Sequence, residues 1–235
     1  MNDVRGNPNK RDNFSPKIKQ VTGKIRTYFI NEFFLRGGKG MKTKIAMVAP
    51  MAGDPNNEKG RQVVENIFVK NANKLKEEGT EVDYILLNKG ITDTDHLAWE
   101  ALNVWNMYEL FEAVRGLKGQ DYDAVVIHCY SDPHLTACRQ IMDIPVVGVV
   151  QTSMMIANMM GSKFGVITFT KHIIELIDDL ALKYGFKDRA VRTLSMETPN
   201  RDFVKSYFDA HELIEKFKGF ARQSIEDGAE VLVPG

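Results

Sequence analysis

The sequence predicts an α/β protein with two similar lobes, each a parallel sheet flanked by helices, and a cleft between the lobes. From residue 42 onward, short apolar runs alternate with segments whose apolar residues recur at helical spacing, which indicates βαβ units. Glycines follow several of the helical segments directly, as they do at helix ends. A chain of 235 residues is long enough to bury a sizeable core.

The elements alternate regularly along the chain. We expect strands at residues 44–49, 82–87, 124–128, 145–150, 164–168, 190–194 and 230–235. We expect helices at about 58–78, 107–115, 133–142, 152–160, 173–184 and 201–227. The first strand leads into a turn-rich stretch that begins at Pro50. We divide the chain into a first lobe at residues 41–145 and a second lobe at residues 146–235.

Residues 1–40 differ from the rest of the chain. They hold nine Lys and Arg against three Asp and Glu, whereas residues 41–235 hold 22 against 28. The basic residues are scattered, so we expect a disordered or appended leader. The run Arg36 to Gly40 can be encoded by a purine-rich tract like a bacterial ribosome-binding site, which would make Met41 the native start. N-terminal sequencing of the native protein tests this hypothesis.

Composition limits the classes of function. The acidic body argues against a nucleic-acid surface, and no apolar run approaches the length of a membrane helix. Two cysteines are too few for a disulfide framework, so we expect a cytoplasmic protein. We also expect a small-molecule substrate and a homo-oligomer. The helix at about 201–227 is one candidate for a dimer face, although packing of one lobe on the other explains it as well.

Cys129 is the candidate for chemistry. It follows the apolar strand at 124–128 and precedes Ser131 and Asp132, either of which can cap a helix with Pro133 in its first turn. Open α/β sheets bind ligands at the carboxyl ends of their strands, and a helix N-terminus there favours a thiolate. A buried, unreactive cysteine is the alternative, because free cysteines are among the most buried residues.

The sequence contains no motif for dinucleotide binding, metal binding or a serine nucleophile. The loop after the first strand lacks the glycine spacing that binds dinucleotides, the histidines and cysteines lack metal-site spacing, and no nucleophile elbow occurs. Adjacent strand residues point to opposite faces, so His128 is interpreted as a packing residue. His134 is assigned to the surface. Cys138 falls in step with apolar helix positions and is interpreted as an inert core cysteine.

Four segments resemble one family. Cys129-Tyr130-Ser131-Asp132-Pro133, Ile144 to Gly148, Phe164 to Thr168 and the closing Gly228 to Gly235 are similar to the aspartate/glutamate/hydantoin racemase superfamily, above all its hydantoin-racemase branch. The resemblance covers about residues 42–235. It implies racemisation or epimerisation of a small amino-acid, carboxylate or hydantoin-like compound, with neither cofactor nor metal. In this family two cysteines move a proton to and from the carbon next to a carbonyl.

The resemblance also implies roles for individual residues. Cys129 would be one of the two acid–base groups. The substrate-binding residues would be Tyr130 and Ser131 through their backbone N–H groups, Gln151 and Thr168 in the pocket lining, and Pro50 and Asp54 in the loop after the first strand. The sequence Ala49-Pro50-Met51 departs from the family's usual asparagine-bearing loop, which leaves the substrate open.

The second cysteine is expected directly after Gly235, where this sequence has none, so we expect that the sequence is truncated. Two alternatives stay open. One is a one-cysteine decarboxylase or cis–trans isomerase of the same superfamily. The other is a non-catalytic small-molecule-binding protein.

Overall fold

A computed structural model describes residues 42–53, 68–92, 96–97, 99–198 and 209–235. The leader at 1–40, Asp54 and the first part of two expected helices lie outside these residues. Residues 42–235 form one compact unit. It contains two parallel sheets flanked by helices, which confirms the predicted fold class.

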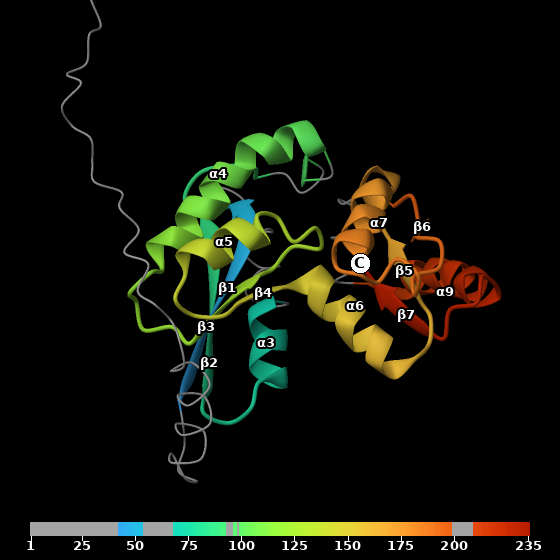
Figure 1. The fold of residues 1–235 in the computed structure, drawn as a ribbon, viewed down its shortest axis with the longest axis horizontal. Coiled ribbons are helices and arrows are strands. Elements are labelled where there is room, and N and C mark those ends of the chain that lie inside the picture. The colour runs from blue at the N-terminus through green and yellow to red at the C-terminus, as the bar shows by residue number, and fades with distance from the viewer. Residues whose placement is uncertain (1–41, 54–67, 93–95, 98, 199–208) are drawn as a thin grey trace, which may run out of the picture. The chain divides into compact units, whose positions relative to one another are not determined.

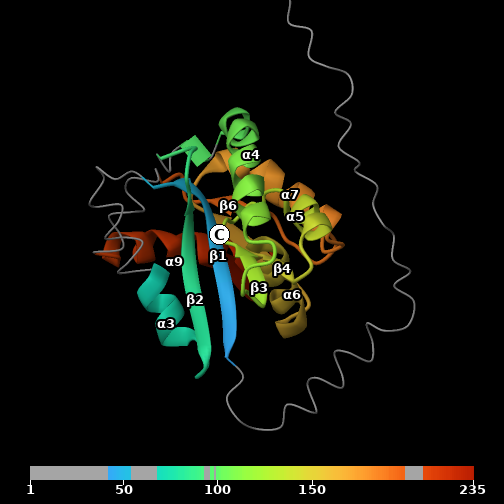
Figure 2. The same cartoon turned by 90° about the vertical axis from the view of Figure 1, so that its left-hand side faces the viewer.

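The first sheet has the strand order β2-β1-β3-β4, and its strands lie side by side in Figure 2. The strands span Thr43–Ala52 (β1), Thr80–Leu87 (β2), Ala124–Ile127 (β3) and Val146–Gly148 (β4). All three pairings are parallel. The strand β4, which the predicted division assigns to the second lobe, therefore belongs to the first sheet.

Three helices pack against this sheet (Figure 1): α3 (Lys70–Leu75), α4 (Glu100–Gly116) and α5 (Leu135–Ile141). The first core lies between the sheet and α4 and α5. Buried side chains of β1 and β3 meet Leu110 and Val114 of α4 and Leu135 and Cys138 of α5 there. By contrast, Leu75 of α3 is 82% exposed.

The second sheet has the order β6-β5-β7, with strands Phe164–Thr168 (β5), Leu194–Ser195 (β6) and Val231–Pro234 (β7). Its helices are α6 (Val149–Met160), α7 (Ile174–Lys183) after the short 3-10 helix Lys171–Ile173, and α9 (His211–Glu226). Successive side chains of β5 point to opposite faces. Phe164 and Val166 accordingly pack with α6 and α7, and Ile167 packs with α9. No described helix is both long and apolar enough to cross a membrane.

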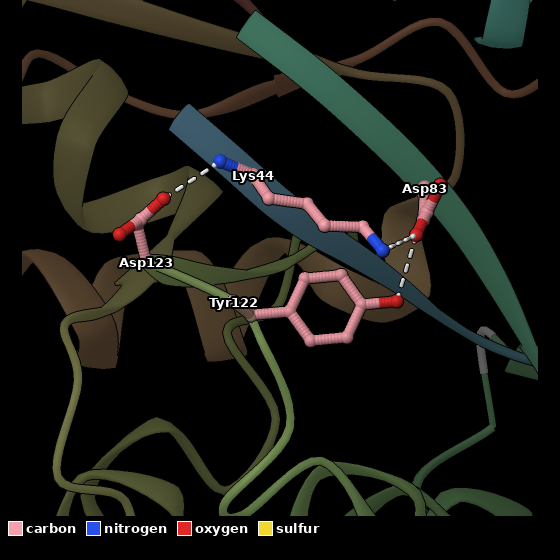
Figure 3. Close-up of polar contacts among 4 residues, drawn as sticks. All are labelled: Lys44, Asp83, Tyr122 and Asp123. Atoms are coloured by element: carbon pink, nitrogen blue, oxygen red, sulfur yellow. Dashed lines mark hydrogen bonds and ion pairs between the residues drawn. The ribbon is translucent and has the colours of Figure 1, made fainter. Parts of the chain in front are cut away.

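A polar cluster joins three strands at the amino end of the first sheet (Figure 3). The Lys44 Nζ atom lies 3.2 Å from Asp83 Oδ2, and Tyr122 Oη donates to the same oxygen at 2.8 Å. The backbone N–H of Lys44 donates to Asp123 Oδ2 at 2.8 Å. The hydrogen bond from Tyr122 and the ammonium of Lys44 lower the pKa of Asp83. These contacts tie β1, β2 and the start of β3 together.

Candidate functional site

Cys129 lies just beyond the carboxyl end of β3, as predicted, and it is partly buried. Its backbone N–H donates to the carbonyl of Ile127 at 3.0 Å, and the N–H of Asp132 donates to the Cys129 carbonyl at 3.2 Å. The Sγ atom lies 3.0 Å from the hydroxyl oxygen of Ser131. The turn after β3 therefore holds a thiol and a hydroxyl in direct contact.

The electrostatics of Cys129 differ from the prediction. Burial raises the pKa of the thiol to about 11, and the nearby charge of Asp132 acts in the same direction. Hydrogen bonds from the Ser131 hydroxyl and backbone N–H oppose this shift only in part. The expectation that a helix N-terminus would favour a thiolate is therefore wrong for this structure. Desolvation outweighs the local donors, and Cys129 is a protonated thiol at neutral pH.

The helix after Cys129 begins later than predicted. Helix α5 starts at Leu135, with His134 at the N-cap position, and no side chain caps it. Both Asp132 and His134 have left-handed backbone conformations, with φ of 44° and 51°. These conformations add a turn that delays the helix. The prediction that Ser131 or Asp132 caps this helix, with Pro133 in its first turn, is wrong.

Asp132 instead binds the N-terminus of α6. Its Oδ1 atom accepts from the N–H of Val150 at 2.9 Å, and its Oδ2 atom accepts from the N–H of Gln151 at 2.8 Å. The hydroxyl of Tyr184 donates to the same Oδ2 atom at 2.9 Å. Sequence reasoning considered Asp132 only as a cap of α5. Its partners lie on segments distant in sequence, so no local signal identified them.

The predicted lining residues Gln151 and Thr168 have different surroundings. The backbone of Gln151 is joined to the Cys129 turn through Asp132, and its side-chain oxygen accepts from Arg139 at 2.8 Å. Thr168 is fully buried at the end of β5, where its hydroxyl donates to the carbonyl of Thr170 at 2.9 Å. The structure therefore brings the Gln151 backbone to the turn and occupies the Thr168 hydroxyl within the second sheet.

Tyr130 links the turn to the end of the chain. Its ring packs against the second core and against Gly235, where an added Cβ would lie 2.2 Å from a ring carbon. The N–H of Gly235 donates to the carbonyl of Ile167 at 2.9 Å. Within the described residues the buried Tyr130 hydroxyl has no hydrogen-bond partner. The carboxyl end of β7 therefore lies beside the residue that follows Cys129.

A buried asparagine on α4 organises the end of β1. The Nδ2 atom of Asn106 donates to the carbonyl of Pro50 at 2.7 Å, and its Oδ1 atom accepts from the N–H of Ile91 at 2.9 Å. Asn106 is only 2% exposed. Pro50 lies within β1 instead of in the predicted turn, and Asp54 lies outside the described residues. Sequence reasoning missed Asn106, because its role depends on contacts across 56 residues.

The other candidates take the structural roles predicted for them. The His128 Nδ1 atom lies 3.0 Å from the hydroxyl of Tyr84, and the ring packs edge-on against Phe68 and Tyr84. Burial lowers the pKa of His128. Cys138 is fully buried in the first core, and His134 is exposed. Among the described residues, no group of three or more His, Cys, Asp or Glu side chains is placed to hold a metal ion.

With this geometry described, comparison with known proteins identifies the family. Residues 89–235 match the sequence profile of Asp/Glu/hydantoin racemase. The chain belongs to this family. The matched region includes Cys129, its turn and the whole second sheet.

Curated relatives support the hydantoin-racemase branch. The chain is 30% identical to a hydantoin racemase of Pseudomonas sp. (strain NS671) over 127 residues, which cover 54% of this chain and 50% of the relative. It is 28% identical to a hydantoin racemase of Paenarthrobacter aurescens over 158 residues, which cover 67% of this chain and 65% of the relative. The matches thus span about half to two thirds of these relatives' lengths.

Solved structures support the fold. An allantoin racemase from Klebsiella pneumoniae superposes with a TM-score of 0.67 at 22% identity, covering 82% of this chain and 74% of that one. An allantoin racemase from Pseudomonas fluorescens gives a TM-score of 0.66 at 19% identity, covering 82% and 76%. At these identities the likeness shows the arrangement of strands and helices and says nothing about the substrate of this chain.

Proposed function

We propose that this protein is a cofactor-independent racemase or epimerase in which Cys129 exchanges a proton with the α-carbon of a small substrate. One observation carries the proposal. In a chain of the Asp/Glu/hydantoin racemase family, Cys129 lies at the carboxyl end of a parallel strand with the Ser131 hydroxyl 3.0 Å from its sulfur. Ligands of open α/β sheets bind at this edge.

The protonation state of Cys129 suggests which half of the reaction it performs. Removal of the α-proton leaves an enolate-like carbanion, which must receive a proton on its opposite face to invert the centre. A thiol held protonated by burial can donate that proton and become a thiolate, which the hydroxyl and N–H of Ser131 stabilise. For the opposite enantiomer the same sulfur must act as the base.

The substrate class rests on the relatives. The curated proteins are named hydantoin racemases, and hydantoins carry an acidic proton at the carbon between a carbonyl and a nitrogen. We propose a small amino-acid, carboxylate or hydantoin-like compound as the substrate. The chemistry asks for no metal or organic cofactor, because a carbonyl beside the reacting carbon already stabilises the negative charge.

The second acid–base group would lie across the substrate from Cys129. Cys138 does not fill this role, since it is fully buried in the first core. Gly235, at the carboxyl end of β7, packs against Tyr130, the neighbour of Cys129. This contact supports a second group at the carboxyl end of β7.

One observation favours the one-cysteine alternative. Burial raises the pKa of the Cys129 thiol to about 11, so this group is suited to deliver a proton to one face of a carbanion. An enzyme with a single thiol at the site protonates one face of a carbanion, as in a decarboxylation. It would exchange the α-proton of one enantiomer without inverting it.

Deuterium exchange tests both possibilities. The 235-residue protein is incubated in D₂O with each enantiomer of a 5-substituted hydantoin and of the matching amino acid. Loss of the α-proton is followed by NMR, and inversion is followed by optical rotation. Cys129→Ala should lower the exchange rate by roughly 10²- to 10⁴-fold, as expected for loss of a general acid–base group. Cys138→Ala is the matched control and should retain exchange.

The outcomes separate the functions. Exchange with inversion supports a racemase, and exchange of one enantiomer with retention supports one-thiol chemistry. A protein that binds these compounds without any exchange is a binding protein, and the proposal then fails. Equal exchange by wild type and Cys129→Ala would remove Cys129 from the mechanism.

A further inference from the structure

Asp132 holds the turn that carries Cys129 through three hydrogen bonds. The carboxylate accepts from two backbone N–H groups, those of Val150 and Gln151, and from the hydroxyl of Tyr184. It is 5% exposed. Hydrogen bonds to an ionised carboxylate are stronger than those between neutral groups, so this is a firm attachment.

The partners of Asp132 belong to elements that build the second core. Helix α6 places Val150, Met154 and Ala157 in that core, and Tyr184 follows α7. A negative charge at the N-terminus of α6 is also favourable for the helix dipole. The carboxylate therefore joins the turn after β3 to two helices of the other core.

The geometry of the turn couples this carboxylate to the thiol. The backbone N–H of Asp132 donates to the carbonyl of Cys129, so movement of one residue moves the other. The carboxyl group also fills the space beside Gly148, where an added Cβ would lie 2.6 Å from its atoms. Glycine at this position leaves room for the carboxylate.

We propose that Asp132 is a positioning residue for Cys129, because its carboxylate ties the turn that carries the thiol to the N-terminus of α6 and to Tyr184. Its negative charge also acts to raise the pKa of the thiol. The proposal rests on the proposed function only in treating Cys129 as the reacting group. A purely structural aspartate would stabilise the fold and leave the chemistry of the thiol unchanged.

The test is the pH dependence of Cys129 alkylation in the full chain. Wild type and Asp132→Asn are treated briefly with iodoacetamide between about pH 7 and pH 12, a range that brackets the ionisation of free and buried thiols. Peptide mass spectrometry measures Cys129 and Cys138 separately. Asparagine retains a carbonyl acceptor and tolerates the left-handed backbone of residue 132.

Asp132→Asn should move the midpoint of Cys129 alkylation to lower pH, because the nearby negative charge is removed. A shift of half a pH unit or more corresponds to a rise of about threefold or more in the thiolate fraction below the midpoint. The Cys138 profile should not move. An unchanged Cys129 midpoint in a folded Asp132→Asn protein would overturn the proposal, whatever the change in stability.

Two further variants complete the test. Asp123→Asn makes the same change of charge before β3, where the carboxylate accepts the backbone N–H of Lys44, and it should leave the Cys129 profile unchanged. Tyr184→Phe removes one donor and keeps the charge of Asp132. It should alter the rate of Cys129 alkylation without moving the midpoint to lower pH.

Tyr184→Phe decides the matter if Asp132→Asn does not fold. An unchanged rate at Cys129 would then overturn the positioning role, and a changed rate beside an unchanged rate at Cys138 would support it. Alkylation requires no substrate. A protein with the expected shift and no α-proton exchange would refute the proposed function and retain this inference.

Discussion

Polar side chains lie at both ends of the first sheet, and their burial and their hydrogen-bond partners differ between the two ends. At the amino end, Lys44, Asp83 and Tyr122 bind one another, and the ion pair is 35% and 47% exposed. At the carboxyl end, Asn106 and Asp132 are nearly fully buried, and most of their partners are backbone groups. Exposed pairs contribute little to stability, whereas loss of a buried partner leaves a desolvated group unsatisfied.

The difference indicates which end of the first sheet holds its chain segments in fixed positions. A side chain that binds backbone N–H and C=O groups fixes the path of the chain around it. Asn106 does this for the end of β1 and Asp132 for the turn after β3, and both segments lie at the edge that carries Cys129. The amino-end cluster joins strands that the sheet already holds in register.

Asn106→Ala should have the largest effect on stability. It leaves the Pro50 carbonyl and the Ile91 N–H buried without their partner, at a cost of about 2–4 kcal/mol for the two groups. Urea unfolding followed by circular dichroism measures the change. Asn103→Ala is the matched control one turn earlier on α4, where a partly buried asparagine binds the carbonyl of Leu97. If Asn106→Ala lowered the free energy of unfolding no more than Asn103→Ala does, the proposed contrast between the two ends of the sheet would be wrong.

Gly148→Ala should have the next largest effect. The added Cβ would lie 2.6 Å from the carboxyl group of Asp132, which must move and strain its bonds to α6. Overpacking of this kind costs about 1–3 kcal/mol. The control is Gly116→Ala, where nothing lies within 4 Å of the added atom. Thermal unfolding should show a lower melting temperature for Gly148→Ala alone, and equal values would show that the Asp132 contact is loose.

The sequence was sufficient for elements that local pattern determines. β5 spans Phe164–Thr168 as predicted, because a fully buried strand appears as an unbroken apolar run between turns. Cys138 was placed in the core by its helical spacing. The start of α4 was harder to predict, since Trp99, Val104 and Trp105 are all more than half exposed and blur the apolar periodicity.

The site was predictable only in part. Cys129 and Ser131 were found because the site begins at a strand end, which the sequence marks clearly. Pro50 was assigned to a turn because it begins a stretch rich in turn-forming residues. In the structure it lies where the pairing of β1 and β2 is irregular between Val48 and Ala52, and proline is tolerated at such irregularities. Asp132 and Asn106 bind partners that only the folded chain brings near, so no sequence window contains the interaction.

Tyr122→Phe should have the smallest effect and tests the amino end. The variant removes the hydrogen bond that contributes most to lowering the pKa of Asp83. A lowered carboxyl pKa in the folded state stabilises the protein above the unfolded pKa, and this contribution is lost as pH falls through the folded value. The variant should therefore lose less than about 1 kcal/mol at neutral pH, because the group is nearly half exposed. The difference from wild type should shrink in acid, where Asp83 is protonated in both proteins. Urea unfolding at neutral and acid pH measures this difference. A loss as large as that of Asn106→Ala would show that the amino end is as tightly built as the carboxyl end, and the contrast between them would be wrong.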